Sequence, residues 1–425
     1  MKKYELYKDS GVGWIGEIPS HWSCVKVKHL LRERVDKSED GIGEPLSMSQ
    51  KYGLIPTSQM DVVPNLATSY VGAKRTRQGD MVLNKLKAHL GVFALSAYDG
   101  LVSPDYAVYY GTGRADLEYL EYLFKTPLYV SEFIKKTTGV AIGFNRLYTD
   151  DLFSIPAHYP PMQEQKRIVD YLKDKTLKIE QYVSARERER ELLDSLKQSE
   201  IANVVTKGLN PNVRMKDSGI FWVPQIPSHW KTTKLKHILV KLNREKSEDA
   251  ELLVCSNKGK VIKKGDTKMG LVADNNDIYQ GVCKGDLLIH GMDTWHGAIA
   301  ISDYDGMCTP VVHVCDSNQN KKFVAFYLQF MALSKVFKLI SNGVRQNTSD
   351  FRSWDKVGAI PIMLPPLEEQ QAIVDYIEAK LSKIDSCMAD LQAEIDYLKE
   401  FKQRLISDVV TGQICVAKPQ KGEQQ

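Results

Sequence analysis

The 425-residue chain contains two copies of the same sequence motifs, and this internal repeat constrains its fold more than any other feature. The motif Lys-Asp-Ser-Gly at residues 8–11 recurs at residues 216–219. Ile-Pro-Ser-His-Trp at residues 18–22 recurs at residues 226–230, at the same offset. A repeat that spans about half of the chain is too long for a solenoid and indicates two duplicated halves.

The end of each copy carries a second repeated motif. Pro-Pro-x-x-Glu-Gln-x-x-Ile-Val-Asp-Tyr begins at residue 160 and begins again at residue 365. Between about residues 41–78 and 250–284, in contrast, the copies show almost no agreement. Two similar frames with different central surfaces suit a protein that recognises two different things.

Each half is predicted to contain a mixed α/β domain followed by a long helix, which gives an α+β fold class. Short apolar and β-branched runs, bounded by Gly-Asp and Tyr-Asp-Gly turn signals, predict strands at residues 81–83, 91–95, 287–289 and 298–301. Apolar stretches predict helices around residues 117–133 and 323–340. The predicted segments are a first domain at 1–158, a helical spacer at 159–210, a second domain at 211–362, a second spacer at 363–415 and a polar tail at 416–425.

The two spacers are predicted to be long helices that start at the Pro-Pro pairs, because proline is tolerated in a first helical turn. Apolar residues of the second spacer alternate by four and three over three heptads, at Ile377, Leu381, Ile384, Met388, Leu391, Ile395 and Leu398. In the first spacer, Arg186 and Arg190 replace Leu391 and Ile395. We expect the helices, each roughly 65–70 Å long, to pair as an antiparallel coiled coil within a pseudo-twofold repeat. The arginines would then meet acidic residues or leave the seam. The alternative is two separate helices that each pack on their own domain.

Composition and motifs exclude several functional classes. The net charge of +4 is mildly basic, and seven cysteines without a C-x-x-C pair favour a reducing compartment. No signal peptide and no apolar run of about 18 residues is found, so we expect a cytoplasmic protein without a membrane partner. The sequence lacks a phosphate-binding loop, an Asn-Pro-Pro-aromatic tetrad and a standard set of metal ligands. We therefore expect no catalytic site, no metal and no cofactor.

The doubled motifs resemble the specificity subunits of type I restriction–modification systems over nearly the whole chain. The resemblance depends on Asp-Ser-Gly…Trp…Ile-Pro-Ser-His-Trp near the start of each half and on Pro-Pro-x-x-Glu-Gln at each spacer. It implies two target-recognition domains that each read one half of a split, asymmetric target in double-stranded DNA. It also implies helices that dock two modification (adenine methyltransferase) subunits, with restriction (motor-nuclease) subunits joining for cleavage. The arginine-bearing seam of the first spacer is the one notable departure.

Candidate DNA contacts follow from side-chain chemistry, since Arg and Lys suit guanine while Asn and Gln suit adenine. In the first domain they are Lys74, Arg75, Arg77, Asn84, Lys85, Lys87, His89, Asn145 and Arg146. In the second domain they are His290, Thr294, Trp295, His296, Arg345, Gln346, Asn347 and Arg352. For any one of them, a solvated surface side chain is the alternative. His21, Trp22, His229 and Trp230 recur in both halves, so we expect them to be structural.

Two other functional classes remain open from the residues alone. One is an enzyme, such as a fused nuclease or methyltransferase, whose motifs are not recognised. The other is an assembly scaffold without a role in DNA binding, although a scaffold does not explain two diverged surfaces on equal frames.

Overall fold

The computed structural model describes residues 2–49, 52–61, 69–137, 146–247, 249–267, 278–341 and 350–416, except for the side chain of His89. The chain forms two compact units. The first contains residues 1–186 and 393–425, and the second contains residues 187–392. Each unit therefore contains one α/β domain together with parts of the two long helices, α4 (Met162–Lys207) and α8 (Leu367–Val410).

A four-stranded antiparallel sheet forms the centre of the first unit. Its strand order is β4 (Leu31–Glu33), β11 (Tyr106–Gly111), β8 (Met81–Asn84) and β9 (Phe93–Leu95). Side chains alternate between the two faces of a strand, so β8 sends Met81 and Leu83 into one apolar cluster and Val82 into another. Because both faces are covered, β8 reads as a continuous apolar run, as the sequence predicted.

The second unit repeats this sheet strand for strand. Its order is β16 (Leu239–Leu242), β23 (Val312–Ser317), β20 (Leu287–His290) and β21 (Ile299–Ile301). Leu287 and Ile289 face the larger apolar cluster, and Leu288 faces the smaller one. The predicted strands are thus confirmed in both halves.

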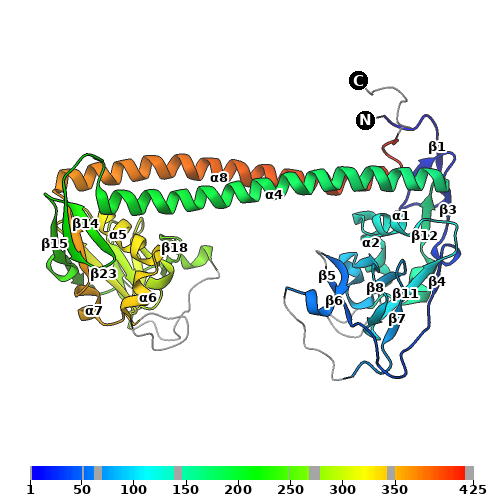
Figure 1. The fold of residues 1–425 in the computed structure, drawn as a ribbon, viewed down its shortest axis with the longest axis horizontal. Coiled ribbons are helices and arrows are strands. Elements are labelled where there is room, and N and C mark those ends of the chain that lie inside the picture. Colours follow the sequence, from blue (N-terminus) through cyan, green and yellow to red (C-terminus); the bar gives the residue numbers. More distant parts are fainter. Residues whose placement is uncertain are drawn as a thin grey trace. The chain divides into compact units, whose positions relative to one another are not determined.

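Each unit also contains four shorter pairs of antiparallel strands among its described residues, several of which are labelled in Figure 1. In the first unit the pairs are β1 (Tyr7–Asp9) with β2 (Glu17–Pro19), β3 (Ser23–Lys26) with β12 (Pro156–Tyr159), β5 (Leu46–Ser49) with β6 (Gly53–Pro56), and β7 (Lys74–Thr76) with β10 (Gly100–Val102). In the second unit they are β13 (Met215–Ile220) with β14 (Val223–Pro227), β15 (Lys231–Lys234) with β24 (Pro361–Leu364), β17 (Leu253–Ser256) with β18 (Lys260–Lys263), and β19 (Gln280–Val282) with β22 (Gly306–Cys308).

Each apolar stretch predicted as helix contains two helices. The first holds α1 (Leu117–Phe124) and α2 (Pro127–Lys136), and the second holds α5 (Lys321–Leu333) and α6 (Val336–Ile340). Thr126 lies between the two helices and caps the second, since its hydroxyl accepts the amide of Tyr129. Lys335 separates the second pair with a left-handed φ of 58°. A further short helix follows in each unit, α3 (Thr149–Ser154) and α7 (Trp354–Gly358).

The long helices α4 and α8 pair in antiparallel fashion, and Figure 1 shows them side by side. In the first unit Glu180 pairs with Lys402 at 2.8 Å. In the second unit Lys197 pairs with Asp385 at 2.7 Å. From the first ion pair to the second, the residue numbers increase along α4 and decrease along α8, so the two helices are antiparallel. Ile377, Ile384, Leu391 and Ile395 of the predicted seam are buried. The paired coiled coil is confirmed, and the alternative of two separate helices is wrong.

The two seam arginines have different partners. The Arg186 guanidinium lies 3.2 Å from the Glu394 carboxylate and stacks on the Tyr182 ring. Arg190 instead donates to the side-chain oxygen of Gln392. The expectation of an acidic partner is therefore confirmed for the first arginine, whereas an amide takes that place for the second.

The repeated motifs join each domain to the start of its own long helix. In the first unit the Glu164 carboxylate accepts hydrogen bonds from Trp22 Nε1 at 3.2 Å and contacts His21 Nε2 at 2.8 Å. In the second unit Glu369 contacts Trp230 at 3.1 Å and His229 at 2.7 Å. Trp22 and Trp230 are at most 1% exposed. The predicted structural role of the repeated histidines and tryptophans is confirmed.

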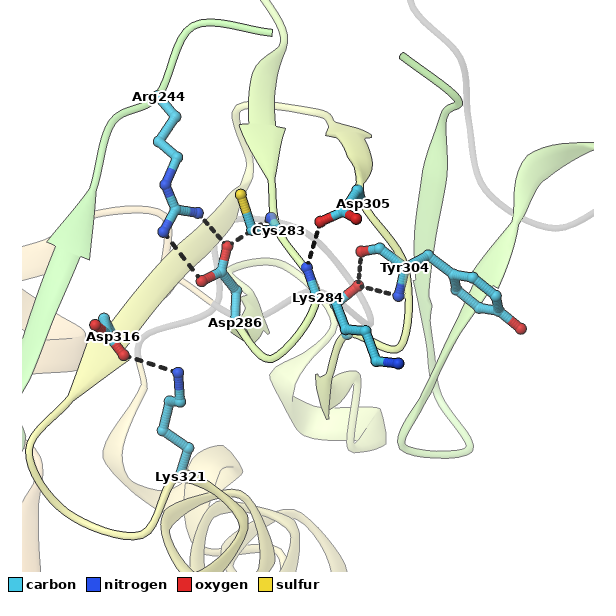
Figure 2. Close-up of polar contacts among 9 residues, drawn as sticks. Arg244, Cys283, Lys284, Asp286, Tyr304, Asp305, Asp316 and Lys321 are labelled. Atoms are coloured by element: carbon cyan, nitrogen blue, oxygen red, sulfur yellow. Dashed lines mark hydrogen bonds and ion pairs between the residues drawn. The ribbon is translucent and has the colours of Figure 1, made fainter. Parts of the chain in front are cut away.

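The Gly-Asp and Tyr-Asp-Gly motifs form two turns that contact each other, shown in Figure 2 for the second unit. Asp286 accepts the amide of Cys283 at 2.8 Å, and Asp305 accepts the amide of Lys284 at 2.8 Å. Arg244 donates two hydrogen bonds to Asp286, one of them at 3.2 Å. The first unit repeats the ion pair, between Arg34 and Asp80 at 2.7 and 2.9 Å.

The two arginines reach these aspartates from different positions in the frame. The Gly281 amide donates to the Arg244 carbonyl at 2.9 Å, as the Arg75 amide donates to the Asp36 carbonyl at 2.8 Å in the first unit. Arg244 thus occupies the backbone position of Asp36, two residues beyond Arg34. Both units therefore contain an ion pair between an arginine and the aspartate of the Gly-Asp turn, although the arginine stands at a different position of the repeat.

Candidate nucleic-acid interface

The clearest difference between the units lies where the central strands β8 and β20 end. Asn84 leads into a 3-10 turn at Lys85–Leu90, and His290 precedes a 3-10 turn at Thr294–His296. Both turns end on a glycine with left-handed φ, 64° at Gly91 and 79° at Gly297. The predicted loop tips are therefore ordered turns with a common exit and different side chains.

In the first unit this turn meets two segments from elsewhere in the chain. Tyr106 pairs with Asn84 in the sheet, so Asp105 lies at the end of the ladder beside Lys85. The Leu147 amide donates to the Lys85 carbonyl at 3.2 Å, which brings the preceding Arg146 to the same place. The Arg146 guanidinium and the Asp105 carboxylate form an ion pair at 2.9 Å.

Two further charged residues complete this group. Lys74 on β7 lies 3.4 Å from Glu33 at the end of β4. Burial lowers the pKa of the half-buried Lys85, and the neighbouring positive charge of Lys74 lowers it further. We call Glu33, Lys74, Lys85, Asp105 and Arg146 the charged group of the first unit. Within the described part of the chain, Lys85 is its one cation without an ion pair.

The other candidates of the first domain differ in accessibility. Arg75 pairs with Asp40 at 3.1 Å, so its charge is compensated within the unit. Asn84 is 7% exposed, and its side chain accepts the amide of Leu86. Arg77 and Lys87 are exposed. Asn84 is thus buried and has a structural contact, whereas Arg77 and Lys87 lie on the surface.

In the second unit the corresponding turn carries histidine and tryptophan. His290 Nδ1 accepts the amide of Asp293 at 3.1 Å, and burial is the main cause of its lowered pKa. Trp295 Nε1 donates to Ser341 Oγ at 2.8 Å, and the Lys338 ammonium lies 5.7 Å from the Trp295 ring. Thr294 is buried, whereas His296 is exposed.

A buried histidine fixes the segment that carries Arg352. His313 Nε2 donates to the Phe351 carbonyl at 2.7 Å, and the Phe351 amide donates to the Gly291 carbonyl at 3.1 Å. A Cβ at Gly291 would lie 2.7 Å from the Phe351 oxygen, so only glycine permits this approach. The exposed Arg352 follows directly, beside the turn that carries His290.

Several candidates lie outside the described residues. They are Asn145, Arg345, Gln346, Asn347 and the side chain of His89. Among the residues that the structure does describe, no group of three His, Cys, Asp or Glu side chains has a geometry suited to a metal ion. All seven cysteines are free thiols. None of the described helices combines the length and the apolar character that a bilayer crossing requires.

Comparison with known proteins finds the same resemblance that the sequence motifs indicated. Residues 227–397 match the family described as "Type I restriction modification DNA specificity domain". The second half of the chain is thus similar to this domain, and the resemblance of the chain to the specificity subunits of type I restriction–modification systems is confirmed.

The relatives cover nearly the whole chain. A protein of Methanocaldococcus jannaschii, described as "Putative type I restriction enzyme MjaX specificity subunit", is 22% identical and aligns with 95% of this chain and 96% of its own length. A chain from a structural study of assembly and conformational transition in a type I system has a TM-score of 0.69 at 14% identity, covering 93% of this chain and 99% of that one. The crystal structure of the HsdS subunit from Thermoanaerobacter tengcongensis has a TM-score of 0.51 at 14% identity, covering 93% and 98%. These two structural matches confirm the fold.

Sequence reasoning did not select the two acidic members of the charged group. Glu33 pairs with Tyr109 in the sheet, and the matching ladder position in the second unit is Lys241, opposite Cys315. Asp105 likewise precedes β11 where Val311 precedes β23. A charge that differs between matched positions of the two copies was the signal that could have found them.

Proposed function

We propose that this protein is the DNA-reading subunit of a type I restriction–modification complex and that it recognises a bipartite, asymmetric target. The observation that carries the proposal is that the two units share a backbone arrangement but present different side chains at the same place. Lys85, Asp105 and Arg146 gather at the end of β8, whereas His290, Trp295 and Arg352 gather at the end of β20. Bases are distinguished by the donor and acceptor pattern that they present, so unlike side chains on like frames support unlike half-sites.

The proposed partners are double-stranded DNA, two modification subunits and restriction subunits. Exposed apolar side chains on the long helices support docking there, because apolar side chains that gather on one exposed face mark interaction sites, and Leu192 and Leu196 lie one helical turn apart. Leu192 and Leu196 on α4 are 65% and 44% exposed, and Tyr397 on α8 is 66% exposed. In this proposal the chain has no catalytic site of its own, and it works in the cytoplasm.

The length of the paired helices is proposed to set the gap between the half-sites. Half-sites one helical turn apart have centres about 34–36 Å apart on the same face of the duplex. α4 is one uninterrupted helix of 46 residues. Its continuity, and its burial against α8 along the heptad seam, support a fixed spacing over a flexible one.

Co-expression with a modification subunit tests the proposal. The complex is expected to methylate adenines within one split sequence, whereas the purified chain with magnesium and S-adenosylmethionine neither methylates nor cleaves DNA. Activity of the chain without partners would favour an enzyme. A complex whose DNA binding is indifferent to salt and to substitutions in both turns would favour a scaffold.

A further inference from the structure

The charged group of the first unit has no counterpart in the second. Matched ladder positions replace Lys74 by Gln280, because Val102 pairs with Lys74 as Cys308 pairs with Gln280. Gly291 takes the place of Lys85 at the strand end, and Val311 takes the place of Asp105. A contact that every duplex requires would be expected in both units. A contact present in one unit fits a feature that only one half of the target contains.

The group also has hydrogen-bond donors that its own carboxylates do not satisfy. It contains three cations, Lys74, Lys85 and Arg146, and two carboxylates. Arg146 Nε is buried and has no acceptor among the described residues, although its terminal nitrogen contacts Asp105. The Arg146 side chain as a whole is 37% exposed, so an outside acceptor can reach part of the side chain but not the buried Nε.

We propose that Arg146 reads a guanine in the half-site recognised by the first domain, with Asp105 as its positioning residue. This inference rests on the proposed function. Guanine presents two acceptors, O6 and N7, that match the fork formed by the two terminal nitrogens of one guanidinium. Asp105 holds the guanidinium in one orientation, which reduces the ordering cost of that contact. Lys85 supplies a further donor beside it.

The carboxylate of Asp105 decides between a base and a phosphate. A phosphate bound at Arg146 would bring its own negative charge close to Asp105, and like charges at such distances repel. The acceptor edge of guanine carries no net charge, so it can bind beside a carboxylate. The pairing of Arg146 with Asp105 therefore favours a base edge over the DNA backbone.

Arg146→Lys tests the assignment because it keeps the charge and removes the fork. The complex with its modification subunit is presented with DNA targets randomised at each position, and methylation is measured by sequencing. We expect discrimination for a G·C pair at one position of one half-site to fall about 5- to 100-fold. Discrimination in the other half-site and the salt dependence of binding should stay unchanged. An unchanged second half-site also verifies that the variant folds and assembles.

Asp105 variants test its positioning role. Asp105→Val introduces the residue found at the matched position of the second unit and should weaken the same base preference. Asp105→Asn keeps an acceptor for Arg146 and should recover part of it. Arg114→Lys is the matched control, since exposed Arg114 lies beyond the opposite end of β11 and should change neither half-site.

Several outcomes would overturn the inference. They include uniform loss of methylation with a weaker salt dependence, an altered preference in the other half-site, and a half-site without a G·C pair. A split target that Arg146→Lys leaves unaltered would refute this inference alone. A wild-type complex with no split target would refute the proposed function itself.

Discussion

Single carboxylates hold the start of each long helix to its domain. Glu164 is the more deeply buried of the two, and it accepts a hydrogen bond from Tyr4 Oη at 2.6 Å in addition to those from Trp22 and His21. Glu369 is more exposed, at 26% of its side-chain surface. The two glutamates thus offer a matched pair for measuring what this contact contributes to stability.

We expect Glu164→Ala to lower the free energy of unfolding by on the order of 3 kcal/mol, because it leaves buried donors without an acceptor. Glu164→Gln keeps an acceptor and should lower the free energy of unfolding less. Glu369→Ala should also lower it less, because the Glu369 side chain is more exposed to solvent. Urea denaturation followed by tryptophan fluorescence measures all three. Equal losses for Glu164→Ala and Glu369→Ala would contradict this account of the motif.

His158 makes the stability of the first unit depend on pH. Its ring stacks on Trp22, and its two nitrogens contact Tyr129 Oη and the Val410 carbonyl, both at 3.1 Å. Burial lowers the pKa of His158 from the ordinary value of 6.5 to about 4, even though the Val410 carbonyl opposes this shift. The unfolded chain therefore binds a proton at this site more readily than the folded chain.

Because the folded-state pKa is depressed, stability should fall as pH drops from about 6.5 towards 4. The slope from this residue is about 1.4 kcal/mol per pH unit. His158→Gln should be less stable at pH 7 but should lack this part of the pH dependence, as measured by denaturation between pH 7 and 4.5. Parallel curves for the two proteins would show that His158 does not titrate as described.

At the residue scale, the sequence predicted which residues are structural better than it predicted which residues they contact. Trp22 was expected to be structural because it recurs, and its burial confirms this. Its acceptor, Glu164, was visible as part of a motif, yet no local pattern links residues so far apart in the chain. The same limit applies to the charged group, since Glu33 and Asp105 acquire meaning only when the sheet brings them to Lys74 and Arg146.

At the scale of elements, the spacing of apolar residues predicted the long paired helices and the central strands. The heptads of α8 predicted a buried seam, and the apolar runs at 81–83 and 287–289 predicted central strands. The break between α1 and α2 was missed because apolar side chains continue through it. Only the capping by Thr126, and Pro127 in the first turn of α2, mark the new helix.

Removal of one heptad from each long helix tests the proposed ruler. Deleting residues 184–190 from α4 and residues 390–396 from α8 keeps the heptad phase and shortens the pair by about 10 Å. The gap of the methylated target should change by up to about three base pairs, or the complex should fail to assemble. An unchanged gap in an assembled complex would refute the idea that helix length sets the spacing.

At the scale of the whole molecule, one chain carries two versions of the same domain. In each version, one backbone hydrogen bond joins the two ends of the segment that contains the diverged part, at matched places. The Val27 amide donates to the Ile155 carbonyl at 2.9 Å, and the Leu235 amide donates to the Ile360 carbonyl at 2.9 Å. Residues 27–155 can therefore replace residues 235–360 with junctions in equivalent backbone.

Mapping methylated adenines for this chimaera tests the central claim most directly. If each domain reads its own half-site, a chain with two first-type domains should direct its modification partner to an inverted repeat of the first half-site, because equal readers on a twofold frame give a palindrome. The second half-site should disappear from the target. A chimaera that still methylates the original asymmetric sequence would contradict the claim that these two surfaces read the DNA.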